Sequence, residues 1–119
     1  LLAGLAADQP MTLFADEWRT PLEVRAAARA IVELAATDAA GVLHLGGADR
    51  VTRAELGRRA LDAIGWAGPR PAEGSRRDFA VERPEDTSLA STAAQARLSF
   101  PLPGLEVGLA DWARDRGVA

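Results

Sequence analysis

The sequence contains no cysteine, lysine, tyrosine or asparagine, and its single histidine is His44. Without cysteine, the chain forms no disulfide, thiolate nucleophile or cysteine-ligated metal site. One histidine cannot supply a pair of zinc ligands. Schiff-base chemistry, a P-loop and a Tyr–Lys acid/base pair all need lysine, so they are excluded as well. Any catalysis within these 119 residues would therefore depend on Ser, Thr, Asp, Glu, Arg and one His.

All 14 basic residues are arginine, and 17 acidic residues give a net charge of −3. This acidic balance argues against a nucleic-acid partner, which requires clustered positive charge. No apolar run approaches the ~20 residues of a membrane span. Residues 1–7 lack the basic start of a signal peptide. We therefore expect a cytoplasmic protein without membrane contact, and the initial Leu1 suggests a segment of a longer chain.

Helical spacing and capping signals predict most of the secondary structure. The clearest helix covers residues 20–37, with Thr20 as N-cap, Pro21 in the first turn and Glu23 completing a capping box. We expect further helices at residues 1–7, 52–64, 91–98 and 105–112, and strands at residues 11–15 and 42–46. The apolar stripe predicted for the first of these helices comprises Val24, Ala27, Ala28, Ile31, Leu34 and Ala35.

Residues 66–84 contain several prolines and arginines and predict a long loop, a feature that is usually functional or disordered. Few short strands and several amphipathic helices do not make a self-sufficient doubly wound sheet. The predicted fold class is therefore α/β: residues 1–119 form one small lobe that packs against another surface.

Three stretches in series carry a family resemblance: FADEWRTPLEV (14–24), GVLHLGGADRVTRAELG (41–57) and RPEDTSLASTAAQARLSF (83–100). Together they resemble the C-terminal, substrate-binding part of extended short-chain dehydrogenases/reductases. The nearest branch is the dTDP-4-dehydrorhamnose reductase-like proteins of the NAD-dependent epimerase/dehydratase superfamily.

The resemblance implies a division of labour within a longer protein. An N-terminal Rossmann domain would bind NAD or NADP, and a Tyr-x-x-x-Lys pair would carry the chemistry on a nucleotide-linked sugar. This chain contains neither, so it would bind no cofactor by itself and supply no catalytic residue. The expected partners are the nucleotide-linked sugar, the Rossmann domain of the same protein and, where the full protein self-associates, a second copy in a homodimer.

Three residues are the candidate substrate contacts. Arg19 precedes the first long helix, and the resemblance implies that it holds the sugar-nucleotide diphosphate; the alternative is an ion pair with Asp16 or Glu17. The resemblance implies Arg83 as a second diphosphate contact; the alternative is a solvated arginine in an arginine-rich loop. Trp18 could stack on a base or a sugar, or lie in the core.

Other conspicuous residues receive structural interpretations. We expect His44 to be a hydrogen-bonded residue within a strand. The arginines of the helix near residue 53 are interpreted as a solvated face, comprising Arg50, Arg53, Arg58 and Arg59. Gly46 and Gly47 are interpreted as a plain turn, because the remaining phosphate-loop positions are missing.

Two alternatives to a sugar-nucleotide-binding lobe stay open. The first is a non-catalytic regulatory or partner-binding homologue of the rhamnose-type reductases. It is compatible with Ala90, Ala93 and Ser99, which stand where the family often has Asp, Lys and Gly. The second is a stand-alone α/β module with an unknown ligand.

Overall fold

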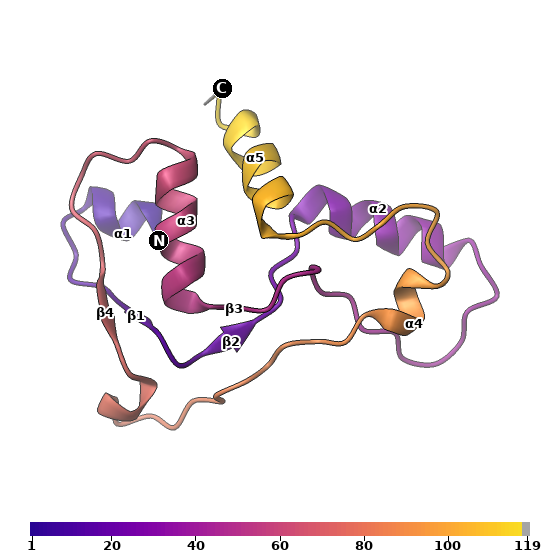
Figure 1. Cartoon of the computed structure of the whole chain (residues 1–119), viewed down its shortest axis with the longest axis horizontal. Helices are drawn as coiled ribbons and strands as arrows, with labels where there is room; N and C mark the ends of the chain where they lie inside the picture. The colour runs from indigo at the N-terminus through magenta and orange to yellow at the C-terminus, as the bar shows by residue number, and fades with distance from the viewer. Residues whose placement is uncertain (118–119) are drawn as a thin grey trace. The chain divides into compact units, whose positions relative to one another are not determined.

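The computed structural model describes residues 1–117 (Figure 1). The chain divides into two compact units. The first unit combines Leu1–Arg19 with Val51–Thr87, and the second combines Thr20–Arg50 with the chain from Ser88 onward. The prediction of one lobe over residues 1–119 stays a prediction, and each unit is described by itself.

Short strands and one long helix build the first unit. Its helices are α1 (Leu2–Ala6) and α3 (Arg53–Ala63), and its strands are β1 (Thr12–Phe14), β2 (Trp18–Arg19), β3 (Val51–Thr52) and β4 (Ala72–Gly74). A short 3-10 helix, η1, covers Arg76–Asp78. Strands β1 and β4 pair in parallel and run side by side in Figure 1, whereas β2 and β3 pair antiparallel. The predicted helix at residues 1–7 and strand at residues 11–15 are thereby confirmed.

Close packing of α3 on β1 forms the core of the first unit. A Cβ atom at Gly57 of α3 would collide with the side chain of Leu13, so glycine permits this approach. Leu61 on the same helix is fully buried. The other buried apolar residues of this unit are Leu5, Phe14, Val51, Ala54 and Ala60.

The start and end of α3 follow the sequence signals. Thr52 is the N-cap, and its hydroxyl oxygen accepts the N–H of Glu55 at 3.1 Å. Gly65 follows the helix with φ +63°, a left-handed conformation that favours glycine. The helix expected at residues 52–64 is therefore confirmed, and local signals mark both of its ends.

Residues 66–84 are more ordered than a loop. They contain β4, which pairs with β1 in the register Thr12↔Ala72 and Phe14↔Gly74, and they also contain η1. The sequence AEG of β4 has no period-2 apolar pattern, because the strand is short and mostly exposed. The prediction of an unstructured loop over the whole of residues 66–84 is therefore wrong in this part.

Three helices belong to the second unit: α2 (Val24–Ala35), α4 (Thr92–Gln95) and α5 (Leu105–Asp115). Its buried apolar residues are Ala30, Leu34, Ala94, Leu102, Leu105 and Ala113. The last helix agrees with the prediction of an amphipathic helix from residue 105. The helix predicted at 91–98 is shorter than expected, because α4 ends at Gln95.

The structure corrects the predicted start and buried face of α2. Glu23, not Thr20, is the N-cap, and its Oε2 accepts the N–H of Arg25 at 2.8 Å and of Ala26 at 3.0 Å. Val24 and Ile31 of the predicted inner stripe are 74% and 57% exposed. The charged residues Arg25, Arg29 and Glu33 share one face of α2, but only Ala30 and Leu34 of its apolar residues are buried within this unit.

The strand predicted at residues 42–46 is not formed. His44 is exposed in an irregular segment, so the expectation of a histidine within a strand is wrong. Gly46 and Gly47 are buried at the end of this segment. A Cβ atom at either glycine would collide with the backbone or side chain of Thr20 or Pro21, which explains why this segment carries glycine there.

Candidate functional site

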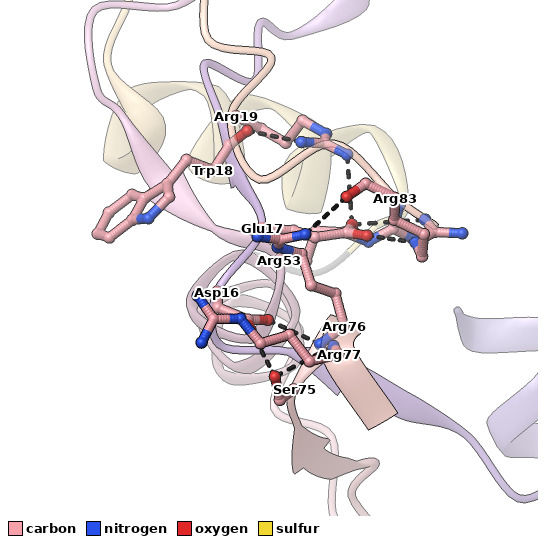
Figure 2. Close-up of polar contacts among 9 residues, drawn as sticks. All are labelled: Asp16, Glu17, Trp18, Arg19, Arg53, Ser75, Arg76, Arg77 and Arg83. Atoms are coloured by element: carbon pink, nitrogen blue, oxygen red, sulfur yellow. Dashed lines mark hydrogen bonds and ion pairs between the residues drawn. The ribbon is translucent and has the colours of Figure 1, made fainter. Parts of the chain in front are cut away.

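Three arginine side chains of the first unit converge on the carboxylate of Glu17 (Figure 2). Arg19 Nη2 lies 3.3 Å from Glu17 Oε2, and Arg53 Nε lies 3.5 Å from the same oxygen. Arg83 donates from Nε to Oε1 and from Nη2 to Oε2, the latter at 3.4 Å. The side chain of Glu17 is fully buried, whereas those of Arg19, Arg53 and Arg83 are 25%, 43% and 36% exposed. We call these four residues the Glu17 cluster.

Strand pairing brings the members of the Glu17 cluster together. Side chains alternate between the two faces of a strand, so Glu17 and Arg19 lie on one face and Trp18 on the other. The N–H of Arg53, the first residue of α3, donates to the carbonyl of Glu17 at 3.0 Å. The antiparallel pair Arg19↔Val51 places the start of α3 beside β2. Arg19 and Arg53, which are 34 positions apart in the sequence, thus belong to one cluster.

The segment that carries Arg83 is held beside β2 by its own contacts. The N–H of Trp18 donates to the carbonyl of Glu85 at 2.8 Å, and the N–H of Thr87 donates to the carbonyl of Trp18 at 3.2 Å. Arg76 donates to the carbonyl of Arg83 at 2.9 Å and forms an ion pair with Glu85 at 2.8 Å. Contacts of Arg76, which precedes Arg83 in the sequence, and of Glu85, which follows it, therefore hold the backbone at Arg83 in place.

Asp16 anchors the start of this turn. Its carboxylate accepts the Ser75 hydroxyl at 2.6 Å and the backbone N–H of Arg76 at 2.8 Å (Figure 2). These hydrogen bonds, that of Arg76 before that of Ser75, lower the pKa of Asp16 below its usual value. The adjacent acidic residues thus have different roles: Asp16 orders the turn, and Glu17 contacts the arginines.

The electrostatics of the Glu17 cluster favour full ionisation. The hydrogen bond from Arg83 lowers the pKa of Glu17, and the charges of Arg83, Arg19 and Arg53 act in the same direction, against the effect of burial. The same hydrogen bond raises the pKa of Arg83. Arg83 also lies over the ring of Phe14, with 5.3 Å from the guanidinium carbon to the ring centroid. Three positive charges and one negative charge leave the cluster cationic.

The structure brings two of the three predicted site residues together. Arg19 and Arg83 both contact Glu17, so the ion pair considered as the alternative for Arg19 is present and belongs to the same cluster. The indole ring of Trp18 points away from the guanidinium groups in Figure 2, as strand alternation requires.

Two members of the cluster were not identified from the sequence. Arg53 is exposed, as the interpretation of a solvated helix face predicts, but its Nε also lies 3.5 Å from the buried carboxylate of Glu17. Glu17 was considered only as an alternative ion-pair partner in a turn. The contacts that define both residues join segments distant in sequence, and no short motif signals them.

A second candidate site is an open cavity of about 770 Å³ in the second unit. Gly46 and Gly47 line one part of it, residues 88–92 and Gln95 line another, and Thr20 and Arg50 also contribute. The paired glycines were the available sequence signal, but they were interpreted as a plain turn. The cavity combines a mostly apolar lining with a few polar side chains, a pattern typical of small-molecule sites.

The glycine pair does not form a phosphate cradle. The N–H of Gly46 donates to the Ser91 hydroxyl at 2.7 Å, and the N–H of Gly47 donates to the carbonyl of Thr20 at 3.1 Å. Both backbone donors that a dinucleotide phosphate would need are thus engaged within the protein. The residues of this turn therefore do not fit the pyrophosphate of NAD or NADP.

Within residues 1–117, no group of three or more His, Asp or Glu side chains is arranged to hold a metal ion. No helix of the described chain is long and apolar enough to cross a membrane.

The sequence comparison identifies the family. The RmlD substrate binding domain matches residues 1–116, and the chain belongs to this family. The resemblance to the substrate-binding part of dTDP-4-dehydrorhamnose reductase-like proteins is thereby confirmed. No curated protein matches the chain significantly.

Solved structures of larger enzymes contain the same fold. The dTDP-4-dehydrorhamnose reductase of Bacillus anthracis str. Ames, in complex with NADP, matches with a TM-score of 0.80 and 17% identity over 96% of this chain and 41% of its own. The corresponding reductase of Yersinia enterocolitica gives 0.75 and 15% over 95% and 40%. The UDP-glucuronic acid 4-epimerase of Bacillus cereus, in complex with UDP-glucuronic acid and NAD, gives 0.67 and 18% over 98% and 38%.

The chain therefore spans about two fifths of the length of these enzymes. The expected fold class, a small α/β lobe of short strands and helices, is confirmed. At this level of identity, the structural likeness establishes the fold, while family membership identifies the lobe as a substrate-binding domain.

Proposed function

We propose that this chain is the sugar-nucleotide-binding lobe of an NAD(P)-dependent reductase or epimerase. Arg19 and Arg83 contact the diphosphate, and the lobe contributes no group to proton or hydride transfer. The observation that carries the proposal is the convergence of these arginines, from sequence-distant segments, on one partly exposed cationic cluster. Guanidinium groups suit this task because their planar N–H donors match phosphate oxygens.

The remaining parts of the active site belong to the rest of the proposed enzyme. The turn at Gly46 and Gly47 has no free backbone donors for a dinucleotide phosphate, and the sequence has no Tyr or Lys. The nicotinamide cofactor would supply hydride chemistry from a companion Rossmann domain. A homodimer remains a proposal for the complete protein.

The test is a calorimetric titration of the full-length protein with dTDP- and UDP-linked sugars. The variants are Arg19→Gln and Arg83→Gln, and the control is Arg58→Gln, which removes an exposed ion pair with Glu73. We expect each site variant to weaken binding about tenfold or more, equivalent to about 1.4 kcal/mol. The control should bind as the wild type does. Absence of binding by the wild type, or unchanged binding by both site variants, would overturn the proposal.

A regulatory homologue is the second candidate function. Ala90 and Ala93 favour it, because they stand where the family often has the charged residues Asp and Lys, and Ser99 stands where the family often has Gly. Ser99 instead donates from its hydroxyl to Glu33 at 2.9 Å. Turnover of a dTDP-linked keto-sugar with NADPH by the full-length protein would refute this alternative. A stable hetero-oligomer without such activity would support it.

A further inference from the structure

Among the described residues, Glu17 is the only charged or polar residue that is buried. An unpaired buried carboxylate is strongly unfavourable, so its position requires the arginines to remain close to it. The constraint is mutual, because each arginine is also restricted by the carboxylate. Since the arginine side chains are 25–43% exposed, the same groups that contact Glu17 also reach the solvent.

We propose that Glu17 is a positioning residue that fixes three arginines as one receptor for the diphosphate group. Arg53 is the third member of this receptor, beside Arg19 and Arg83. This inference rests on the proposed function and deepens it, because it specifies how the arginines are oriented and adds a binding residue at the start of α3.

The donors of the arginines support a ligand in addition to Glu17. Each guanidinium group carries five N–H donors. Contacts with Glu17 use one nitrogen of Arg19, one of Arg53 and two of Arg83. Arg19 engages a second nitrogen, because Nη1 also donates to the carbonyl of Trp18 at 2.7 Å. Donors therefore remain on all three groups after their contacts within the protein are counted. Donors held in place before binding lose less conformational freedom when the ligand arrives.

The charge of the Glu17 cluster fits a diphosphate. Three guanidinium groups and one carboxylate leave a net charge of +2. The diphosphate of a nucleotide sugar is a dianion, so binding would neutralise the cluster. A monophosphate carries about −1.5 to −2 at pH 7, so geometry and not charge must discriminate between the two. A monophosphate places fewer oxygens within reach of three separate guanidinium groups, and we expect the cluster to discriminate against it.

Replacing Glu17 distinguishes positioning from simple charge compensation. If the carboxylate acted only as a counterion, Glu17→Gln would raise the positive charge and strengthen diphosphate binding. If it positions the arginines, the same change weakens binding although the site becomes more cationic. The two roles therefore predict opposite directions for one variant.

The experiment compares dTDP and dTMP affinities of the full-length protein by calorimetry. We expect Glu17→Gln and Arg53→Gln each to weaken dTDP binding about tenfold, and to reduce the preference for dTDP over dTMP. Arg58→Gln is the matched control. A loss of folded protein alone would lower the stoichiometry without changing the affinity ratio, so this ratio separates positioning from a structural effect.

Each other outcome has a definite meaning. Equal or tighter dTDP binding by folded Glu17→Gln overturns the positioning role, and unchanged binding by Arg53→Gln removes Arg53 from the receptor. If Glu17→Gln does not fold, Glu17→Asp withdraws the carboxylate by one methylene and retains its charge; wild-type affinity in this variant would overturn the proposal. Failure of the wild type to bind any nucleotide diphosphate or sugar nucleotide would instead overturn the proposed function.

Discussion

Removing Arg83 should destabilise the fold more than removing an arginine of similar exposure that pairs with an exposed carboxylate. In Arg83→Met, the apolar stem is largely retained, but Glu17 loses its two hydrogen bonds from this side chain. The buried carboxylate keeps only the longer contacts to Arg19 at 3.3 Å and Arg53 at 3.5 Å. Because a buried charge is left undercompensated, we expect a loss of about 1–3 kcal/mol in the free energy of unfolding.

Arg58→Met is the matched comparison. Arg58 forms a 2.8 Å ion pair with Glu73, but both side chains are about half exposed. Exposed pairs contribute about 0–1 kcal/mol, so this variant should remain close to the wild type. The two arginines therefore differ chiefly in the burial of their partner, with Glu17 at 0% and Glu73 at 51% exposure.

Urea unfolding followed by far-UV circular dichroism measures both variants, with equal denaturant slopes required for the comparison. The double variant Arg83→Met/Glu17→Gln completes a cycle that isolates their coupling. Lowering the pH through the depressed pKa of Glu17 should reduce the penalty of Arg83→Met, because the protonated carboxyl no longer needs the cation. Equal losses in Arg83→Met and Arg58→Met at neutral pH would refute the reasoning.

Three further predictions follow from local contacts. The folded-state pKa values of Glu17 and Asp16 are lowered, so their stabilisation is present above the usual carboxyl pKa and is lost as the pH falls through the folded values; acid titration of unfolding should show this decline, and Glu17→Gln should make it shallower. Thr52→Ala removes the N-cap of α3 and should cost about 1 kcal/mol in chemical denaturation. Gly47→Ala places a Cβ against the carbonyl of Pro21 and should lower the melting temperature, whereas Gly47→Ala with wild-type stability would contradict this packing.

Local signals explain the part of the fold that could be predicted from the sequence. The hydroxyl of Thr52 and the backbone freedom of Gly65 act within a few residues of the ends of α3, so both ends were identified correctly. The apolar pattern of α2 separates its charged face from its apolar face, but it does not specify which apolar residues pack within this unit. Tertiary contacts therefore select the buried face at Ala30 and Leu34, which spacing alone does not specify.

The candidate site depends on contacts over longer distances in sequence. Arg19 and Arg83 were selected through the family resemblance, but their common partner Glu17 is visible only after β2, α3 and the turn near residue 83 come together. Arg53 is exposed as expected, but its contact with Glu17 was missed for the same reason: on an isolated helix, its charge is indistinguishable from that of Arg58 or Arg59. The burial of a partner is a property of the fold, and no local pattern encodes it.

A buried carboxylate beneath the proposed anion-binding site is electrostatically reasonable. The three guanidinium groups around Glu17 repel one another. Coulomb's law gives the scale: two like charges about 4 Å apart, at an effective dielectric constant of about 20, repel by about 4 kcal/mol. Glu17 offsets this repulsion, yet its complete burial keeps its own charge away from the solvent-facing side of the cluster. A ligand approaching the exposed guanidinium edges therefore meets oriented donors and a net positive charge. In the proposed receptor, Glu17 lowers the net positive charge of the cluster, but it also holds the guanidinium N–H donors in fixed positions for the ligand.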